Sequence, residues 1–509
     1  MWYLFSYLVF FYSMAIMASY LWLCIQSYRV QNRLALETPD DATVKYMIDR
    51  SPLAPSVSII APAYNEEVNI ITNVKSLLSL DYPNYEIIIV NDGSKDKTLQ
   101  LLIDTFEMET IPYNPIYKVP CKPITELYRS RNADYSRLVV VNKVNGGRKS
   151  DSSNAGINVC KTDYFICTDA DCIVEPMALY RMMWPVMNCH ETMIGVSGTM
   201  LMSNDCDIPW VKQLLNETER KKDEASKAKE SNAINDSGDE GILSWLNNIR
   251  RAVGSWLVNT VILFNPLPKF QQLEYLRSFL IGKLGWSSLN ALPNISGGFG
   301  LFNTEVAIKS GGYDNRSMAE DVDMLLRMVT YMKNHGSVYR LAQVPQVCCW
   351  TKGPETLKGI FNQRSRWARG LFEIVVNHFE MFFNRHYGVM GIVTLPYIFV
   401  FEFLACAIEF LGYCWLLFWL IPTDGVNWDT FFIILGMVYL FSWAMAFVLM
   451  FFDYRIKAVP WKNRLWRYCK FFIYAILEPI YHLCLTIISM RGYIQYMLNK
   501  GLEWKTIER

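Results

Sequence analysis

The chain has 509 residues, which is enough for two or three globular domains, and hydrophobic residues make up 52% of it. Such a high apolar fraction argues against an ordinary soluble protein and favours one that spans a membrane. A formal net charge of +1 gives no support for a nucleic-acid partner. Thirteen scattered cysteines, without a C-x-x-C repeat, predict reduced and buried thiols.

A transmembrane anchor is predicted at the start of the chain, over residues 1–28. These residues carry no charged side chain, and residues 2–25 are long enough, at about 1.5 Å per residue, to cross a bilayer core of about 30 Å. A cleaved signal peptide normally begins with basic residues and ends in small ones, whereas this segment begins with aromatic residues and runs into Arg29. We therefore expect the anchor to be retained.

Residues 55–172 alternate short β-branched runs with helical patterns. The runs cover residues 57–61, 86–90, 138–141 and 164–167. Fully apolar strands separated by helices predict a parallel sheet that is covered on both faces. In such sheets ligands bind beyond the carboxyl ends of the strands. We expect the chemistry to gather at that edge, because the polar residues that follow the runs are Tyr64, Glu66, Asp92, Lys143 and Asp169.

An acidic pair, Asp169 and Asp171, follows the fourth run directly. Strand alternation turns both carboxylates to the same side of the chain, where they could hold one divalent cation and the diphosphate that it neutralises. A hard cation keeps several ligand positions open for phosphate oxygens. The alternative is that the pair caps a helix or lies in a solvated turn.

A charged insertion is predicted over about residues 205–268, where the α/β pattern breaks. Residues 217–240 are rich in charged and small polar side chains and contain no aromatic residue to bury. Residues 242–257 then place apolar side chains at helical spacing, interrupted by Arg250 and Arg251. This pattern fits a helix in the membrane interface or one packed on the domain.

A second acidic pair, Glu320 and Asp321, opens an amphipathic run that continues from residue 322. A carboxylate at such a helix start can project over the sheet edge, and we favour Asp321 as a general base. A positioned carboxylate that removes a hydroxyl proton contributes about 10²- to 10⁴-fold in rate. The alternative role of the pair is to cap the helix and interact with its dipole.

The string Gln363-Arg364-Ser365-Arg366-Trp367 reads Q-x-x-R-W and lies within residues 355–388, where we predict amphipathic interfacial helices. An indole face stacks on the apolar face of a sugar ring, and an arginine fork pairs with phosphate oxygens. The alternative is an ordinary membrane-interface pair of arginine and tryptophan.

Three further transmembrane helices are predicted within residues 389–490, at about 389–421, 430–452 and 471–490, and a tail follows at 491–509. The loop between the last two carries six basic residues and one acid, so the positive-inside rule places it in the cytoplasm, next to anionic lipid. Counting back along the chain, residues 29–388 are expected in the cytoplasm too.

These motifs, taken in order, resemble those of membrane-embedded family 2 glycosyltransferases. The first is Asp92 in Val-Asn-Asp-Gly-Ser, and the two acidic pairs and Q-x-x-R-W follow it. The resemblance is to the processive polysaccharide synthases, which include cellulose, hyaluronan, chitin and poly-N-acetylglucosamine synthases, and it covers roughly residues 55–500. It implies a cytoplasmic domain, residues 55–354, with an α/β fold of the GT-A (nucleotide-diphospho-sugar transferase) type. Transmembrane and interfacial helices would accompany this domain. The protein would lie in a bacterial inner membrane.

The resemblance also implies roles for single residues. The uridine of a UDP-sugar would be held by Tyr64, Glu66 and Asp92, with Lys149 near the nucleotide. Mg²⁺ or Mn²⁺ would bind with the diphosphate at Asp169 and Asp171. Asp321 would be the catalytic base, beside an acceptor loop at residues 296–300. The remaining substrate-binding residues would be Glu320, Gln363, Arg366 and Trp367.

Two positions depart from the motifs of that family. Cys172 stands where cellulose synthases usually have a histidine after the first acidic pair, and Ala319 stands where the family has a threonine before the second pair. A third metal ligand is therefore not expected at position 172.

The implied activity is inverting, processive transfer of a sugar from a UDP donor, with UDP-N-acetylglucosamine as the first choice. The product would be a β-linked exopolysaccharide that the enzyme also translocates. Its partners would be the donor, the growing polysaccharide, the lipid bilayer and an accessory membrane subunit. One alternative is a non-processive enzyme that glycosylates a lipid carrier, and another is a non-enzymatic membrane scaffold or transporter, which would not need the acidic motifs.

Overall fold

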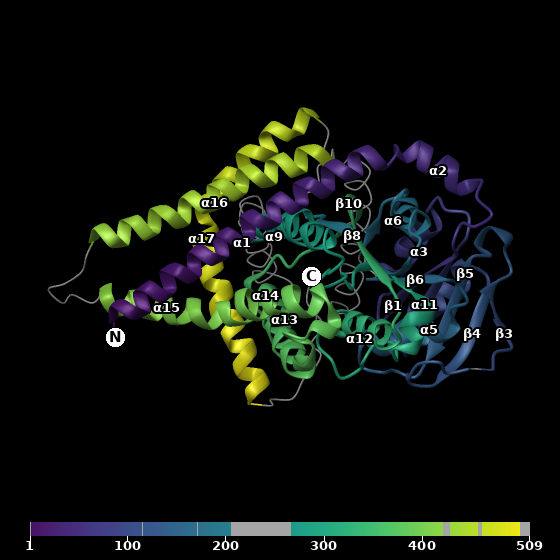
Figure 1. Ribbon diagram of the computed structural model, residues 1–509. Coiled ribbons are helices and arrows are strands. Elements are labelled where there is room, and N and C mark those ends of the chain that lie inside the picture. Colours follow the sequence, from purple (N-terminus) through teal and green to yellow (C-terminus); the bar gives the residue numbers. More distant parts are fainter. Residues whose placement is uncertain are drawn as a thin grey trace, which may run out of the picture.

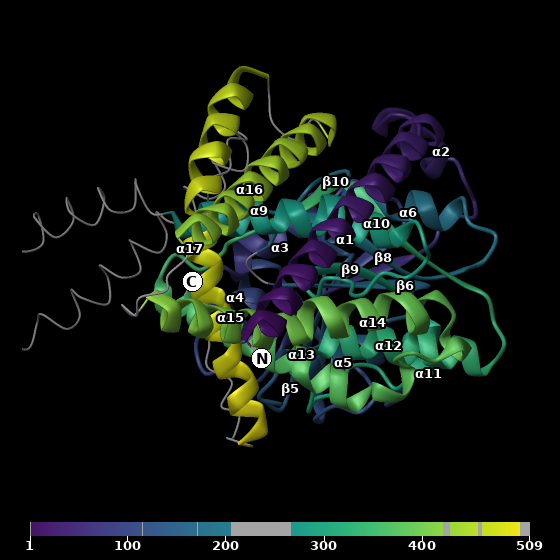
Figure 2. The same cartoon turned by 60° about the vertical axis from the view of Figure 1, so that its left-hand side comes forward.

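The computed structural model describes residues 2–114, 116–169, 172–204, 266–420, 428–456 and 461–498. Asp171, nearly all of the predicted insertion at 205–268 with its helix at 242–257, and the end of the predicted tail lie outside the described residues. Figures 1 and 2 show a sheet flanked by helices at one end of the molecule and long helices that extend away from it at the other.

A ten-stranded sheet, in the order β3-β4-β5-β2-β1-β6-β9-β8-β10-β7, forms the centre of the first part. The four predicted runs are all strands, namely β1 (Val57–Ala63), β2 (Tyr85–Asn91), β5 (Leu138–Lys143) and β6 (Tyr164–Thr168). They are neighbours and run parallel, so their carboxyl ends meet at one edge of the sheet.

The sheet is mixed, so the prediction of a parallel sheet was wrong outside these four strands. Antiparallel pairing joins β3 (Met108–Ile111) to β4 (Ile124–Ser130), β4 to β5, and β9 (Phe299–Asn303) to both β6 and β8 (Thr192–Met202). Beyond these, β10 (Tyr339–Thr351) is parallel to β8 and antiparallel to β7 (Ile173–Val174). The connection between β4 and β5 is too short for the crossover that a parallel pair needs.

Alternate residues of the central strands point to opposite faces of the sheet and enter two separate cores. Ile60 and Ile88 pack in one core with α5 (Lys149–Val159). Ile59 and Ile87 pack in the other with α3 (Ile70–Leu78) and α6 (Ala178–Met187). The other helical elements around the sheet are α2 (Asp41–Asp49), α4 (Thr98–Thr105), η1 (Ala133–Tyr135), α11 (Thr304–Lys309) and α12 (Glu320–Asn334).

The predicted amphipathic segment at 355–388 consists of α13 (Leu357–Asn377), which carries Q-x-x-R-W, and two short turns, η3 (Phe379–Met381) and η4 (Arg385–Tyr387). A continuous helical segment comes earlier in the chain. It consists of α9 (Leu267–Arg277), the π-helical η2 (Ser278–Lys283) and α10 (Leu284–Ser287). The predicted span at about 389–421 consists of η5 (Met390–Thr394), α14 (Leu395–Ile398), η6 (Phe399–Phe403) and α15 (Leu404–Leu420).

Within the described residues, four helices are long and apolar enough to cross a membrane, at Phe10–Glu37, Met390–Trp415, Leu435–Ile456 and Phe471–Met497. They lie in α1 (Trp2–Glu37), the helix that ends in α15, α16 (Trp428–Ile456) and α17 (Trp461–Met497). The four predicted spans are confirmed in length and composition.

Two of the predicted boundaries differ from the ends of the helices. α1 continues past residue 28 and α17 past residue 490. Both extensions pack on protein, since Val30 and Gln31 are buried and Gly492 lies against the backbone of α13. The end of an apolar stretch is therefore not the end of the helix.

Candidate active site

The loops after β1 and β2 lie against each other at the carboxyl edge of the sheet. Asn65 has a positive φ of 56°, which asparagine tolerates better than most residues, and its side chain accepts a hydrogen bond from the Lys95 amide at 2.9 Å. The Glu66 amide donates to the Thr98 hydroxyl at 2.8 Å. These bonds bring Glu66 and the exposed ring of Tyr64 beside the loop that follows β2.

Asp92 lies in that second loop and is 5% exposed. Its Oδ1 accepts hydrogen bonds from the Lys143 ammonium at 2.5 Å and from the Gly146 amide at 2.9 Å, so neither bond uses Oδ2. Lys143 is fully buried and also pairs with Asp151 at 2.6 Å. A buried ammonium between two carboxylates is held in place by them. Lys143 therefore holds Asp92 in a fixed position in the predicted uridine site.

Lys149, at the start of α5, joins the predicted metal carboxylate to the loop at residues 296–300. Its ammonium donates to Asp169 Oδ1 at 2.6 Å and to the Gly297 carbonyl oxygen at 2.8 Å. Burial by itself would lower the pKa of Lys149, but the charge of Asp169 raises that pKa above its ordinary value. Lys149 is therefore a fixed cation at neutral pH.

The same glycine loop contacts the predicted base. The Gly297 amide donates to Asp321 Oδ2 at 2.9 Å, and a Cβ atom at Gly297 would lie 3.2 Å from that oxygen. A Cβ atom at Gly298 would lie 2.7 Å from the methyl carbon of Met200. Side chains at these positions would crowd the site. Gly297 thus connects the two carboxylates: its amide binds Asp321, and its carbonyl oxygen binds Lys149, which in turn binds Asp169.

Glu320 and Asp321 occupy the first turn of α12. Burial and then the negative charge of Asp321 raise the pKa of Glu320 to about 7, while the cations Arg366 and Lys149 act in the opposite direction. Coulomb interactions of this kind weaken with distance. Charges from three separate motifs therefore act on Glu320 at this turn.

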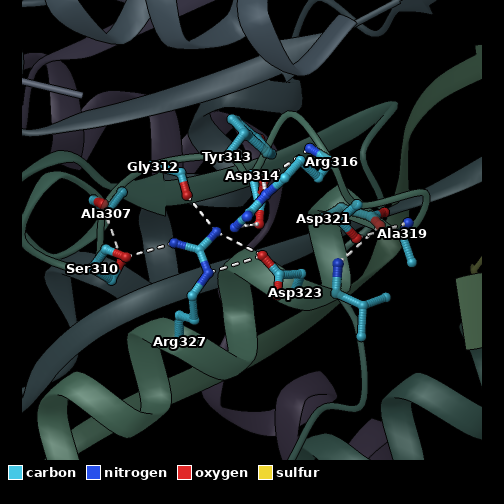
Figure 3. Close-up of polar contacts among 12 residues, drawn as sticks. Ala307, Ser310, Gly312, Tyr313, Asp314, Arg316, Ala319, Asp321, Asp323 and Arg327 are labelled. Atoms are coloured by element: carbon cyan, nitrogen blue, oxygen red, sulfur yellow. Dashed lines mark hydrogen bonds and ion pairs between the residues drawn. The ribbon is translucent and has the colours of Figure 1, made fainter. Parts of the chain in front are cut away.

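The loop that leads into α12 is held by Arg327, as Figure 3 shows. The Arg327 guanidinium donates to the carbonyl oxygens of Ser310 at 2.5 Å and Gly312 at 2.6 Å, and to Asp323 at 2.9 Å. His378, at the end of α13, hydrogen-bonds the other Asp323 oxygen at 2.8 Å. Burial opposes the charge of Asp323, but His378 and Arg327 lower its pKa. Neither partner was predicted, although the four-residue spacing of Asp323 and Arg327 is a helical ion-pair signal.

The Q-x-x-R-W residues lie in the middle of α13. Gln363 is 5% exposed, and its side-chain oxygen has no hydrogen-bond partner within the described parts of the chain. Buried amides are normally hydrogen-bonded, so this oxygen is suited to a ligand. Trp367 is 41% exposed, and the Arg364 guanidinium lies 4.3 Å from its ring centroid. α13 also contacts the loop that leads into α12, which we call the base loop. A Cβ atom at Gly370 would lie 2.9 Å from that of Ala319 in this loop.

Lys283 is a buried cation that was not predicted. It is 4% exposed, and its ammonium lies 4.4 Å from the centroid of the Phe279 ring. Burial lowers the pKa of Lys283 to about 8, and Asp321 is the charge that opposes this shift. A single lysine at the end of the run Ser-Phe-Leu-Ile-Gly-Lys is the one sequence signal that could have marked it, because lysine is rarely buried.

Comparison with known families gives the class of the site. The family described as "Glycosyl transferase family 2" matches residues 58–118 and 121–231, and the one described as "Glycosyl transferase family group 2" matches residues 278–454. Together they span more than half of the chain and include every motif described above. The chain belongs to glycosyl transferase family 2. The predicted family and enzyme class are confirmed.

This glycosyltransferase is similar to poly-beta-1,6-N-acetyl-D-glucosamine synthases. The enzyme of Staphylococcus aureus (strain COL) is 25% identical over 344 residues, which cover 66% of this chain and 60% of the relative. That of Staphylococcus epidermidis is 24% identical over 323 residues, 64% of this chain and 56% of the relative. The match thus spans 60% or less of the length of these curated relatives.

Solved structures with similarity to the glycosyltransferase include a mannosyltransferase from Pyrobaculum calidifontis in complex with GDP-Man and Mn²⁺. It is 14% identical, with a TM-score of 0.42, and the match covers 96% of this chain and 100% of that chain. Staphylococcus aureus TarS 1-349 in complex with UDP-GlcNAc is 12% identical, with a TM-score of 0.31, covering 62% of this chain and 66% of that chain.

Asp169 is the described candidate for a metal ligand in this glycosyltransferase. Its side chain is 31% exposed and gives one oxygen to Lys149, while its partner Asp171 lies outside the described residues. Elsewhere in the described parts of the chain no group of three or more His, Cys, Asp or Glu could hold a metal ion. Cys172 is buried, and its thiol donates to the Gly298 carbonyl oxygen at 3.7 Å. A partly exposed carboxylate suits a hard cation that takes its other ligands from a diphosphate.

Proposed function

We propose that this glycosyltransferase is an inverting, processive polysaccharide synthase that extends a β-linked exopolysaccharide from UDP-N-acetylglucosamine. The observation that carries the proposal is the packing of α13, which touches the base loop at Ala319 through Gly370 and the transmembrane helix α17 at Gly492 through Ser365. An acceptor sugar held on Trp367 would therefore lie between the base and the membrane. The names of the similar Staphylococcus enzymes support the choice of sugar.

In the proposed reaction, an acceptor hydroxyl attacks the anomeric carbon of the donor while the bond from that carbon to the UDP oxygen breaks. Asp321 takes the proton of the hydroxyl, and attack from the opposite side inverts the anomeric centre. Negative charge builds on the departing diphosphate, and Lys149 and Arg366 are the fixed cations that oppose it. Tyr64, Glu66 and Asp92 would hold the uridine, and Glu320, Gln363 and Trp367 would contact the sugars.

A divalent cation, Mg²⁺ or Mn²⁺, fits this arrangement and would be held by Asp169 together with Asp171. When bound, it would neutralise the diphosphate and so aid its departure. Lys149 would then serve to fix the orientation of Asp169, since it holds one oxygen of that carboxylate at 2.6 Å.

The proposal puts the enzyme in a bacterial inner membrane, with the sheet domain in the cytoplasm and the growing polysaccharide passing through the bilayer. The four long apolar helices support a membrane location. An accessory membrane subunit would be a partner in export.

Product size is the experiment that tests this function. Purified protein in nanodiscs would receive Mg²⁺ or Mn²⁺ and, in turn, UDP-N-acetylglucosamine, UDP-glucose, and UDP-glucuronate mixed with UDP-N-acetylglucosamine. We expect a long polymer from UDP-N-acetylglucosamine, and none after chelation of the metal. Asp321→Asn should still bind UDP-N-acetylglucosamine by calorimetry but lose polymer synthesis by about 10²-fold or more.

Other outcomes would replace the proposal. A single sugar attached to lipid would show a non-processive enzyme, and a polymer from another donor would correct the sugar. Near wild-type turnover in Asp321→Asn would exclude this residue as the base. If no donor yields free UDP, the result would favour a non-enzymatic role in the membrane.

A further inference from the structure

Arg364 lies between a carboxylate and the exposed tryptophan of the motif. Its Nη2 donates to Glu274 Oε2 at 2.5 Å, and its guanidinium lies 4.3 Å from the centroid of the Trp367 ring. The side chains of Arg364 and Glu274 are largely buried, whereas Trp367 is partly exposed. One face of the indole is thus covered by a cation, and the exposed remainder can stack on a sugar.

Glu274 is placed where three helices meet. It belongs to α9, it binds Arg364 of α13, and it also accepts a hydrogen bond from the Tyr481 hydroxyl of α17 at 3.3 Å. A long arginine side chain has many rotamers. Without the carboxylate of Glu274, the Arg364 guanidinium loses the ion pair that favours one of these rotamers. The position of Arg364 over Trp367 therefore depends on Glu274.

The transmembrane helix α17 is closely packed on the motif itself. A Cβ atom at Gly492 would lie 2.6 Å from the Ser365 carbonyl oxygen, so the two backbones are in direct contact next to Arg364. Tyr481 reaches Glu274 from the same helix. The path from α17 through Glu274 to Arg364 and Trp367 consists of contacts between neighbouring side chains.

A second ion pair joins the same two helices, α9 and α17, without touching the motif. Arg277 donates to Glu478 at 2.7 Å, and Ser442 of α16 donates to the other Glu478 oxygen at 2.7 Å. Loss of Glu274 removes the ion-pair partner of Arg364, and loss of Glu478 removes that of Arg277, so both losses should cost stability. Only the loss of Glu274 should change the position of Arg364 against the Trp367 ring.

We propose that Glu274 is a positioning residue, which fixes Arg364 against Trp367 and thereby sets how tightly the enzyme holds its acceptor sugar. The inference rests on the proposed role of Trp367 in acceptor binding. Through Tyr481, the same carboxylate ties the acceptor platform to a transmembrane helix. Loss of Glu274 frees Arg364 from the ring, so acceptor binding weakens while donor binding and the base remain as they were.

The test uses the full-length protein in nanodiscs with Glu274→Gln, the conservative Glu274→Asp, and Glu478→Gln as the matched control. For Glu274→Gln we expect the KM of an N-acetylglucosamine oligosaccharide acceptor to rise about threefold to tenfold, the range of a lost cation–π contact and the sugar stacking it supports. The KM of UDP-N-acetylglucosamine should stay within about twofold. Polymers should become shorter, because the product leaves sooner. Glu274→Asp should restore part of the acceptor affinity.

Glu478→Gln should lower the midpoint of thermal unfolding about as much as Glu274→Gln but leave acceptor KM and product length at wild-type values. Equal effects of the two variants on acceptor KM would show a merely structural role and overturn the proposal. A parallel rise in the KM of donor and acceptor in Glu274→Gln would overturn it as well.

A second measurement does not need turnover and separates this inference from the proposed function. Hydroxyl-radical oxidation of Trp367, followed by mass spectrometry of its peptide, reports whether Arg364 covers the ring. Oxidation should increase in Glu274→Gln, because the guanidinium no longer covers the ring, and remain unchanged in Glu478→Gln. Wild-type oxidation in Glu274→Gln would refute the positioning role even in an active synthase. Failure of the wild-type protein to make polymer would refute the proposed function while this readout still stands.

Discussion

Two neighbours of opposite charge surround Asp321. Glu320 is adjacent to it in the first turn of α12, and the buried Lys283 of η2 is close enough for Asp321 to oppose its loss of charge. The negative charge of Asp321 contributes to the raised pKa of Glu320, and it opposes the lowered pKa of Lys283. Variants at these two positions therefore test two separate pH effects, one on catalysis and one on stability.

Replacement of Glu320 by glutamine should move the acid limb of the rate–pH profile to lower pH. In the wild-type enzyme Glu320 keeps its proton until the pH approaches 7, because its pKa is raised to about 7. Glutamine at this position carries no proton that titrates in this range, so the part of the limb that reports Glu320 is lost. The rate of UDP release, measured from about pH 5 to pH 9, shows the limb. A limb that stays in place would mean that Glu320 does not contribute to it.

Lys283→Gln should change how the stability of the protein depends on pH. With a folded-state pKa of about 8, below that of the unfolded chain, Lys283 binds its proton less tightly in the folded protein. The wild-type protein should therefore gain stability as the pH rises above 8, and the variant should lack this gain. Thermal unfolding at several pH values measures it, and equal slopes in both proteins would contradict the burial of the ammonium.

Helix α13 is held from two sides, and this is what gives its motif a fixed position. Toward the sheet, the Met318 amide donates to Glu373 at 3.1 Å, and Gly370 allows Ala319 to come close. Toward the membrane, Gly492 allows α17 to touch the backbone at Ser365. Glycine and alanine permit such approaches because no larger side chain separates the backbones.

Gly492→Ala should separate α17 from α13 and lower both stability and activity. The new methyl group would meet a backbone oxygen, which cannot rotate away as a side chain can, so we expect a loss of about 1–3 kcal/mol. Gly412→Ala in α15 is the matched control, since nothing lies within 4 Å of that position. There the better helix propensity of alanine should leave the protein as stable or up to about 1 kcal/mol more stable. Thermal unfolding in one detergent compares the two, and equal midpoints would contradict the close packing.

The long apolar helices and the catalytic domain are joined along the whole molecule. α1 runs from the end near α15 to α2 beside the sheet, as both views show. On its way, Ser27 donates to the Leu280 carbonyl oxygen of η2, and Leu23 packs against Gly285 of α10. η2 carries Lys283, so α1 also supports the active-site region.

Membrane orientation is a prediction for the whole molecule. If residues 29–388 face the cytoplasm, protease added to inverted membrane vesicles should digest the sheet domain, whereas right-side-out vesicles should protect it. The physical reason is the excess of basic residues around the end of α16 and the start of α17, which the positive-inside rule would keep on the cytoplasmic side. Detergent should abolish the protection. Digestion in intact right-side-out vesicles would reverse the topology.

The central strands and the membrane spans could be predicted because they depend on local patterns. β-branched runs with turn residues between them specified β1, β2, β5 and β6, and the length of the apolar stretches specified the four spans. The antiparallel insertion of β9 was not predictable in this way. It pairs with β6 and β8, which are far away in the sequence, and strand pairing over such distances is decided by packing.

The sequence by itself determined the family, the order of the acidic motifs, the edge of the sheet where they gather and the number of long apolar helices. These properties follow from residue type and spacing along the chain. Only the tertiary structure decided which charges neutralise one another, because partners such as Lys143 and Asp92, or Arg364 and Glu274, lie far apart in sequence and meet only when elements pack. A buried charge needs a partner, but local sequence does not say which residue that partner will be.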